Sequence, residues 1–162
     1  MKIIIPIGIS GSGKSKLYKK RYSDLALVSP DIIRKEINGN RVDNRFSDEV
    51  KNTINSKINE LVEKGESFFY DNTNVNPRRR MELVNQFCDR DDIEIIYVIL
   101  PADIEKSYAR ITEDLKNNVD RADVPYSSLE RQYEQYQKTM ESNFDGENVS
   151  SVIYIQPGEL DD

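Results

Sequence analysis

The sequence predicts an α/β fold in which a five-stranded, mostly parallel sheet is flanked by helices on both faces. Short apolar stretches, most of them rich in β-branched or aromatic residues, alternate along the chain with longer stretches of helical periodicity. Strands that alternate with helices pair in parallel through crossover connections, and the crossovers cover the faces of the sheet. A chain of 162 residues can form one sizeable core, so we expect a single domain over residues 1–162.

Five apolar stretches are predicted to form the strands. The first is the isoleucine-rich run from Lys2 to Ile7, and residues 93–100 give the strongest signal after it. The other three strands are expected at residues 25–29, 67–71 and 149–155.

The helices are predicted from the spacing of apolar residues and from residues that begin or end helices. Pro30 and Asp31 favour a first turn, and Gly39 favours a helix end. The expected helices cover residues 14–22, 31–39, 47–64, 77–88, 103–115 and 125–144. The expected loops are a charged one at residues 40–47 with Arg41 and Arg45, a polar one at residues 116–123, and an acidic tail at residues 158–162.

A glycine-rich motif follows the first predicted strand. Residues 8–15 read Gly-Ile-Ser-Gly-Ser-Gly-Lys-Ser and fit the pattern G-x-x-x-x-G-K-[ST] of a phosphate-binding loop, or P-loop. Its glycines let backbone N–H groups approach anionic oxygens, and the next helix adds its positive end. Lys14 would reach the β- and γ-phosphates of ATP, and the Ser15 hydroxyl would hold Mg²⁺. The predicted ATP-binding residues of the loop are Gly8, Ser10, Gly11, Ser12, Gly13, Lys14 and Ser15. The alternative is a simple turn between a strand and a helix.

Three candidate groups fall at the carboxyl ends of predicted strands, where ligands bind in such sheets: the P-loop, Asp31 and Asp71. Asp31 could orient an acceptor hydroxyl and take its proton, since the chain has no histidine, or it could simply cap a helix. Asp71 could hold Mg²⁺ directly or through water, as a Walker B acid does, or it could fix the adjoining turn. Arg34, one helical turn after Asp31, could bind a phosphate of the acceptor or be a surface arginine.

The polar loop at residues 116–123 could close over the phosphates as a lid. Transfer to an acceptor other than water needs water excluded and a cation near the developing charge. Arg121 lies in this loop and Arg110 on the helix before it, and each could supply that cation or be a surface residue. The three arginines at positions 78–80 cannot all face one site from a helix, and we expect most of them to serve solubility.

Composition limits the classes of function. The net charge of −6 argues against strong non-specific attraction to nucleic acid, although it allows a local basic groove. The absence of histidine excludes a His-ligated zinc site, and Cys88, the single cysteine, excludes an internal disulfide. No apolar run is long enough to cross a bilayer and no export leader is visible, so we expect a cytoplasmic protein without membrane contact.

The order of the motifs resembles a known family. The motifs are G-I-S-G-S-G-K-S, S-P-D-I-I-R, D-N-T-N-V-N-P-R-R-R and R-A-D-V-P. Together they are similar to the 5′-kinase domain of phage-type polynucleotide kinases, which share a P-loop kinase fold with eukaryotic end-healing enzymes. The similarity extends from Lys2 to about Tyr136. A viral origin is one option that this resemblance opens.

The resemblance implies roles for individual residues. ATP would bind at Lys14 and Ser15, Asp31 would be the general base toward a 5′-hydroxyl, and Arg34 would contact the 3′-phosphate of the acceptor. Arg121 would be the lid arginine, although the segment after Arg110 is longer than the usual lid and Arg110 could take that role. The residues expected to shape the acceptor site are Asn72, Thr73 and Asn74.

The leading hypothesis is an ATP-dependent kinase that phosphorylates 5′-hydroxyl ends of DNA or RNA. The second is a small-molecule kinase acting on a nucleoside, a nucleotide or a sugar, including a zeta-toxin-like kinase. The third is a nucleotide-binding adaptor that transfers nothing, for which Asp31 would be dispensable.

Overall fold

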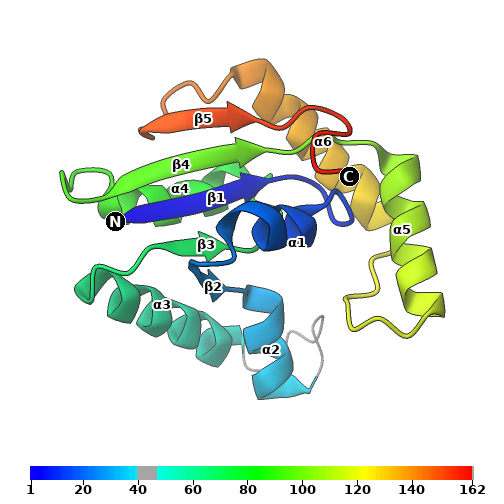
Figure 1. Ribbon diagram of the computed structural model, residues 1–162, viewed down its shortest axis with the longest axis horizontal. Helices are drawn as coiled ribbons and strands as arrows, with labels where there is room; N and C mark the ends of the chain where they lie inside the picture. Colours follow the sequence, from blue (N-terminus) through cyan, green and yellow to red (C-terminus); the bar gives the residue numbers. More distant parts are fainter. Residues whose placement is uncertain (40–46, 162) are drawn as a thin grey trace.

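The computed structural model describes residues 1–39 and 47–161. In this part the chain forms a five-stranded sheet in the order β2-β3-β1-β4-β5, and every neighbouring pair of strands is parallel (Figure 1). The strands are β1 (Lys2–Ile7), β2 (Ala26–Val28), β3 (Phe68–Tyr70), β4 (Glu94–Ile99) and β5 (Ser151–Tyr154). The predicted α/β fold is confirmed, and the sheet is fully parallel. Of the charged loop expected at residues 40–47, residues 40–46 with Arg41 and Arg45 lie outside the described residues, and Ser47 begins α3.

The helices lie between the strands in chain order. They are α1 (Lys14–Leu17), a π-helix η1 (Tyr18–Tyr22), α2 (Pro30–Asn38), α3 (Ser47–Glu63), α4 (Pro77–Phe87), α5 (Ile104–Lys116) and α6 (Tyr126–Ser142). Their bounds agree with the prediction to within a few residues, except that the helix expected at residues 14–22 widens from α to π after Leu17. Among the described residues, no helix combines the length and the apolar character that crossing a membrane requires.

Alternate residues of β1 enter two apolar cores, one on each face of the sheet. Ile3, Ile5 and Ile7 pack in a core that also holds buried side chains of α3 and α4, and partly buried side chains of α6 pack against it. Ile4 packs on the other face, where Leu17 of α1 contributes to the core. Helices therefore cover both faces, as the sequence predicted (Figure 1).

The topology creates a crevice beside the P-loop. β1 and β4 are neighbours, but the chain after β1 continues to β2 on one side and the chain after β4 continues to β5 on the other. Ligands of parallel α/β sheets bind at such a reversal, outside the carboxyl ends of the strands. The carboxyl end of β1 leads directly into residues 8–15, so the P-loop lies at this point.

The acidic tail expected at residues 158–162 packs against the protein through residues 159–161. The Leu160 side chain is buried, at 8% exposure, in the same core as Leu17. Asp161 lies 2.7 Å from Nζ of Lys16, and Glu159 lies 2.7 Å from a guanidinium nitrogen of Arg21. Burial of the leucine and attraction to the basic face of α1 and η1 together hold this turn in place.

Candidate active site

The P-loop occupies residues 8–15 between β1 and α1. Gly11 and Gly13 have φ values of +76° and +109°, which suit glycine, and a Cβ on Gly11 would lie 2.8 Å from the carbonyl oxygen of Ser107. The Ser12 hydroxyl is buried, and nothing within residues 1–39 and 47–161 hydrogen-bonds it. A buried hydroxyl without a partner is costly, and a phosphate seated in the loop would supply the missing acceptor. The loop therefore fits the predicted triphosphate.

The Lys14 side chain folds back over the P-loop. Its Nζ donates hydrogen bonds to the carbonyl oxygens of Gly8, at 3.2 Å, and Ile9, at 2.9 Å. Burial of the ammonium group lowers the pKa of Lys14 to about 8. With this pKa near neutral pH, the charges of neighbouring groups affect the fraction of Lys14 that is protonated.

Three of the predicted site residues act electrostatically on Lys14. The negative charge of Asp71 raises the pKa of Lys14, the positive charge of Arg121 lowers it, and the negative charge of Asp31 raises it. These residues come from the end of β3, from the α5–α6 loop and from the start of α2. The fold thus brings residues from four parts of the sequence to one edge of the sheet.

Asp31 lies in the first turn of α2 without capping it. Ser29 is the N-cap, and its hydroxyl accepts a hydrogen bond from the N–H of Ile32 at 3.3 Å. The Asp31 carboxylate accepts a hydrogen bond from the Arg34 guanidinium at 2.9 Å, and its side chain is 50% exposed. The alternative role of Asp31 as a helix cap is therefore wrong, and the carboxylate lies where a ligand can reach it.

Asp71 and Ser15 are the candidate ligands of Mg²⁺. The N–H of Asp71 donates to the carbonyl oxygen of Val28 at 2.8 Å, which fixes this residue at the carboxyl edge of β3. Ser15 is exposed in the first turn of α1. One carboxylate and one hydroxyl fit Mg²⁺, because this ion keeps several waters and takes substrate phosphate oxygens as further ligands.

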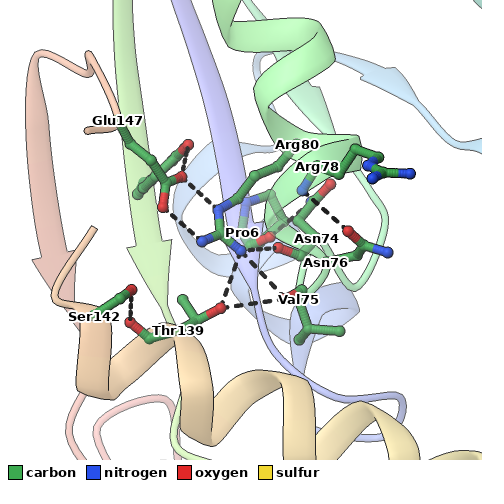
Figure 2. A network of polar contacts seen from close by, with 10 residues as sticks. Pro6, Asn74, Val75, Asn76, Arg78, Arg80, Thr139, Ser142 and Glu147 are labelled. Carbon is green, nitrogen blue, oxygen red and sulfur yellow. Dashed lines mark hydrogen bonds and ion pairs between the residues drawn. The ribbon is translucent and has the colours of Figure 1, made fainter. Parts of the chain in front are cut away.

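The loop after β3 packs directly against the P-loop. The carbonyl oxygen of Thr73 accepts a hydrogen bond from the N–H of Gly8 at 3.0 Å, and Asn72 accepts one from the N–H of Thr73 at 2.9 Å. We expected Asn74 among the acceptor-binding residues. Its side chain is instead 6% exposed, and its amide donates to the carbonyl oxygen of Pro6 at 2.7 Å (Figure 2). Asn74 therefore contributes through the shape of the loop, because its side chain is committed to backbone groups.

Both candidate lid arginines lie near the P-loop. Arg110 donates to the carbonyl oxygen of Gly11 at 3.1 Å, while Arg121 pairs with Asp114 at 2.8 Å and its charge acts on Lys14. The loop that carries Arg121 also reaches α2, because Asp120 pairs with Lys35 at 2.7 Å. The geometry is compatible with a donor-phosphate contact from either arginine.

Two polar residues of this region were missed by the sequence reasoning. Gln132 on α6 accepts a hydrogen bond from the N–H of Ser10 in the P-loop at 2.8 Å. Arg80, expected among mostly exposed arginines, is only 1% exposed and lies in the core, whereas Arg78 and Arg79 are exposed. Nothing local marks Gln132, whereas the helical spacing of Arg80 relative to its apolar neighbours could have revealed its burial.

A cavity of about 240 Å³ opens beside the P-loop, past the carboxyl ends of β4 and β5. Its walls come from the P-loop (Ser12 and Gly13), from the start of α5 and from the C-terminal turn at residues 155–161. Apolar side chains such as Leu100 and Ile155 line one part, and Arg110 contributes a cation. A cavity with an apolar part next to a phosphate loop is suited to a nucleobase.

Comparisons with known proteins bear on the family and the fold of the chain. A family model described as an AAA domain matches residues 3–139. A search of curated proteins found no match. A chain of the Pnkp1/Rnl/Hen1 complex is similar in structure with a TM-score of 0.55 and 20% identity, over 78% of this chain and 41% of that chain. This protein thus spans less than half of that relative.

Two small-molecule kinases have the same fold. A gluconokinase from Sinorhizobium meliloti gives a TM-score of 0.52 at 17% identity, covering 95% of this chain and 82% of its own. A shikimate kinase from Acinetobacter baumannii gives a TM-score of 0.53 at 15% identity, and the match covers 98% of this chain and 86% of that chain. Likeness at these identities concerns the fold alone. The chain belongs to the AAA domain family, and its fold is that of the P-loop kinases.

Proposed function

We propose that this protein is an ATP-dependent polynucleotide kinase that transfers the γ-phosphate of ATP to 5′-hydroxyl ends of DNA or RNA. A P-loop kinase fold implies the use of ATP and usually of Mg²⁺. The observation that carries the proposal is the placement of Asp31, which is half exposed, is not the cap of α2, and acts electrostatically on Lys14. An accessible carboxylate whose charge acts on the phosphate-binding lysine can serve as the base that an alcohol acceptor requires.

On the donor side, the P-loop N–H groups and Lys14 would hold the triphosphate, and the base would enter the cavity beside Leu100. Ser15 and Asp71 would hold Mg²⁺, which would neutralise charge on the donor phosphates. Arg110 or Arg121 would add positive charge as the transferred group separates from its leaving oxygen.

On the acceptor side, Asp31 would accept a hydrogen bond from the 5′-hydroxyl and aim its oxygen at the γ-phosphorus. The new bond forms between this oxygen and phosphorus while the bond from phosphorus to the β–γ bridging oxygen breaks. The hydroxyl proton passes to the Asp31 carboxylate late in the step, so orientation matters more than basicity. Arg34, 2.9 Å from Asp31, would contact a 3′-phosphate of the acceptor through its guanidinium.

A small-molecule kinase is the second candidate. The net charge of −6 favours it, because long nucleic acids usually bind to a basic surface. The fold gives no preference, since it is shared by the gluconokinase and the shikimate kinase.

An acceptor panel with γ-labelled ATP separates these functions. The panel would hold 5′-hydroxyl oligonucleotides of DNA and RNA, 3′-phosphorylated mononucleosides, free nucleosides, gluconate and shikimate. The proposal expects label on the oligonucleotides, at their 5′ ends. Label confined to small acceptors would refute the polynucleotide assignment, and ATP binding without any transfer would favour an adaptor.

A further inference from the structure

A buried ion pair lies beneath the loop that follows β3. Nε of Arg80 is 2.6 Å from Oε1 of Glu147 and its second terminal nitrogen is 2.7 Å from Oε2 (Figure 2). The Arg80 side chain is 0% exposed and that of Glu147 is 6% exposed. A buried pair of charges gives little net stability, because both groups lose their hydration. Removing one partner alone is nevertheless costly, because the other charge stays buried without compensation.

The remaining guanidinium nitrogen of Arg80 holds the loop backbone. It donates to the carbonyl oxygens of Asn74 at 3.0 Å and of Val75 at 3.3 Å. It also lies 3.2 Å from the Thr139 hydroxyl of α6, which itself donates to the Val75 carbonyl at 3.2 Å. Two consecutive peptide carbonyls thus depend on one guanidinium and one hydroxyl.

The Glu147 carboxylate is held by a buried tyrosine, and aromatic rings lie beside its partner Arg80. The Tyr97 hydroxyl donates to Oε1 of Glu147 at 2.7 Å. The rings of Tyr97 and Phe144 each lie 5.7 Å from the guanidinium carbon of Arg80. The carboxylate therefore sets the direction in which the guanidinium points.

The same loop is the side wall of the P-loop. The pairing of β1 with β3 ends at Ile4 and Phe69, so within residues 1–39 and 47–161 no strand lies beside the last part of β1 on that side. The Asn74 amide instead meets the Pro6 carbonyl at 2.7 Å, and the Gly8 N–H meets the Thr73 carbonyl at 3.0 Å. Whatever fixes residues 71–76 therefore also fixes the start of the P-loop.

We propose that Arg80 and Glu147 are positioning residues that hold the loop at residues 71–76 against the P-loop and so set the place of Asp71 and Asn72 relative to Lys14. Neither residue touches a substrate. The proposal has two consequences. The effect on the rate of phosphoryl transfer rests on the proposed function, whereas the effect on the stability of the hydrogen bonds between the two loops does not.

The effect on the hydrogen bonds between the two loops is tested by amide hydrogen exchange of the protein without ligands. Glu147→Gln weakens the hold on Arg80, and Thr139→Val removes the hydroxyl that links α6 to the Val75 carbonyl. Both should speed exchange of the Gly8 amide by roughly tenfold or more, because its bond to Thr73 would open more often. The control is Phe144→Leu, which loosens packing beside Arg80 without removing any hydrogen bond to the loop. A lower melting temperature in the two variants with unchanged Gly8 exchange would overturn the proposal.

The effect on the rate of phosphoryl transfer is tested on the same three variants below their melting temperatures. Glu147→Gln should lower kcat/KM for a 5′-hydroxyl oligonucleotide by roughly 10- to 100-fold, since a small misplacement of reacting groups costs that much. Its KM for ATP should change less than its kcat, and Phe144→Leu should leave both constants near wild type. If kcat/KM fell equally in Glu147→Gln and Phe144→Leu, the ion pair would have a structural role only. If the wild type transfers nothing to any acceptor, the proposed function fails, and Gly8 exchange still decides the present inference.

Discussion

The N–H of Ser10 donates a hydrogen bond to Oε1 of Gln132 at 2.8 Å, joining the P-loop to α6 across 122 positions of sequence. Arg110 of α5 reaches the carbonyl oxygen of Gly11 from the neighbouring helix. These helices flank the loop that carries Arg121. Both ends of the proposed lid are therefore tied to the backbone that would hold the phosphates.

Gln132→Leu removes the acceptor of the Ser10 N–H while keeping most of the side-chain volume. We expect KM for ATP to rise roughly two- to tenfold, the value of one hydrogen bond, with little change in melting temperature. Gln137→Leu, at an exposed position of the same helix, is the matched control. Steady-state kinetics with varied ATP concentration measure KM for ATP. Identical values in the two variants would show that Gln132 does not contribute to ATP binding.

The lowered pKa of Lys14 predicts how ATP binding depends on pH. Below about pH 8 the lysine is charged, and above it the free protein loses this charge. A bound triphosphate favours the ammonium form, so binding above that pH must take up a proton. We expect Kd for a non-hydrolysable ATP analogue to rise by up to about tenfold per pH unit above pH 8.

Calorimetry in buffers of different ionisation enthalpy measures the proton uptake. Lys14→Met should bind more weakly at pH 7 and lose this dependence, and an unchanged profile in that variant would contradict the account.

The architecture could be predicted from the sequence because its determinants are local. The β1 isoleucines, the P-loop glycines and the segment at residues 93–100 each identify their element without distant partners. The placement of Asp31 and Asp71 could be predicted from this architecture, because both residues come directly after strands and the carboxyl ends of parallel strands lie at one edge of the sheet. The structure places both residues at that edge and removes the capping alternative for Asp31.

Only part of what was missed in the sequence depends on distant partners. Arg80 shares a helix face with Val84 and Phe87, four and seven residues on, so its burial could have been predicted from spacing alone. Its partner Glu147 is 67 residues away, and no local pattern indicates it. Gln132 is equally unmarked in a helix rich in glutamine and glutamate.

Arg34→Ala tests the contact to the acceptor phosphate. We expect kcat/KM to fall roughly ten- to a hundredfold for acceptors with a 3′-phosphate, because a charged hydrogen bond is lost, and to fall much less for acceptors without one. Arg90→Ala, which breaks an exposed ion pair with Asp92, controls for the loss of one positive charge. Equal losses on both kinds of acceptor would show that Arg34 does not bind this phosphate.

Asp71→Asn tests the proposed metal site. The amide is a weaker ligand than the carboxylate, so the Mg²⁺ concentration that gives the half-maximal rate should rise by about tenfold or more. The variant should also lower the pKa of Lys14 further, since the Asp71 charge now raises it, and so move the pH dependence of ATP binding to lower pH. Asp89→Asn is the exposed control. A magnesium requirement like that of the control would argue for a purely structural Asp71.

The central claim is that α2 aims an acceptor alcohol at a phosphate held by the loop after β1, and Asp31→Asn tests it most directly. The measurement is single-turnover transfer from γ-labelled ATP to a 5′-hydroxyl oligonucleotide, with ATP affinity determined in parallel and Glu36→Gln on the same helix as control. The account predicts 5′-end label with the wild type and the control, a rate lower by about 100-fold or more with Asp31→Asn, and ATP affinity nearly unchanged. Equal rates in the wild type and Asp31→Asn would contradict it.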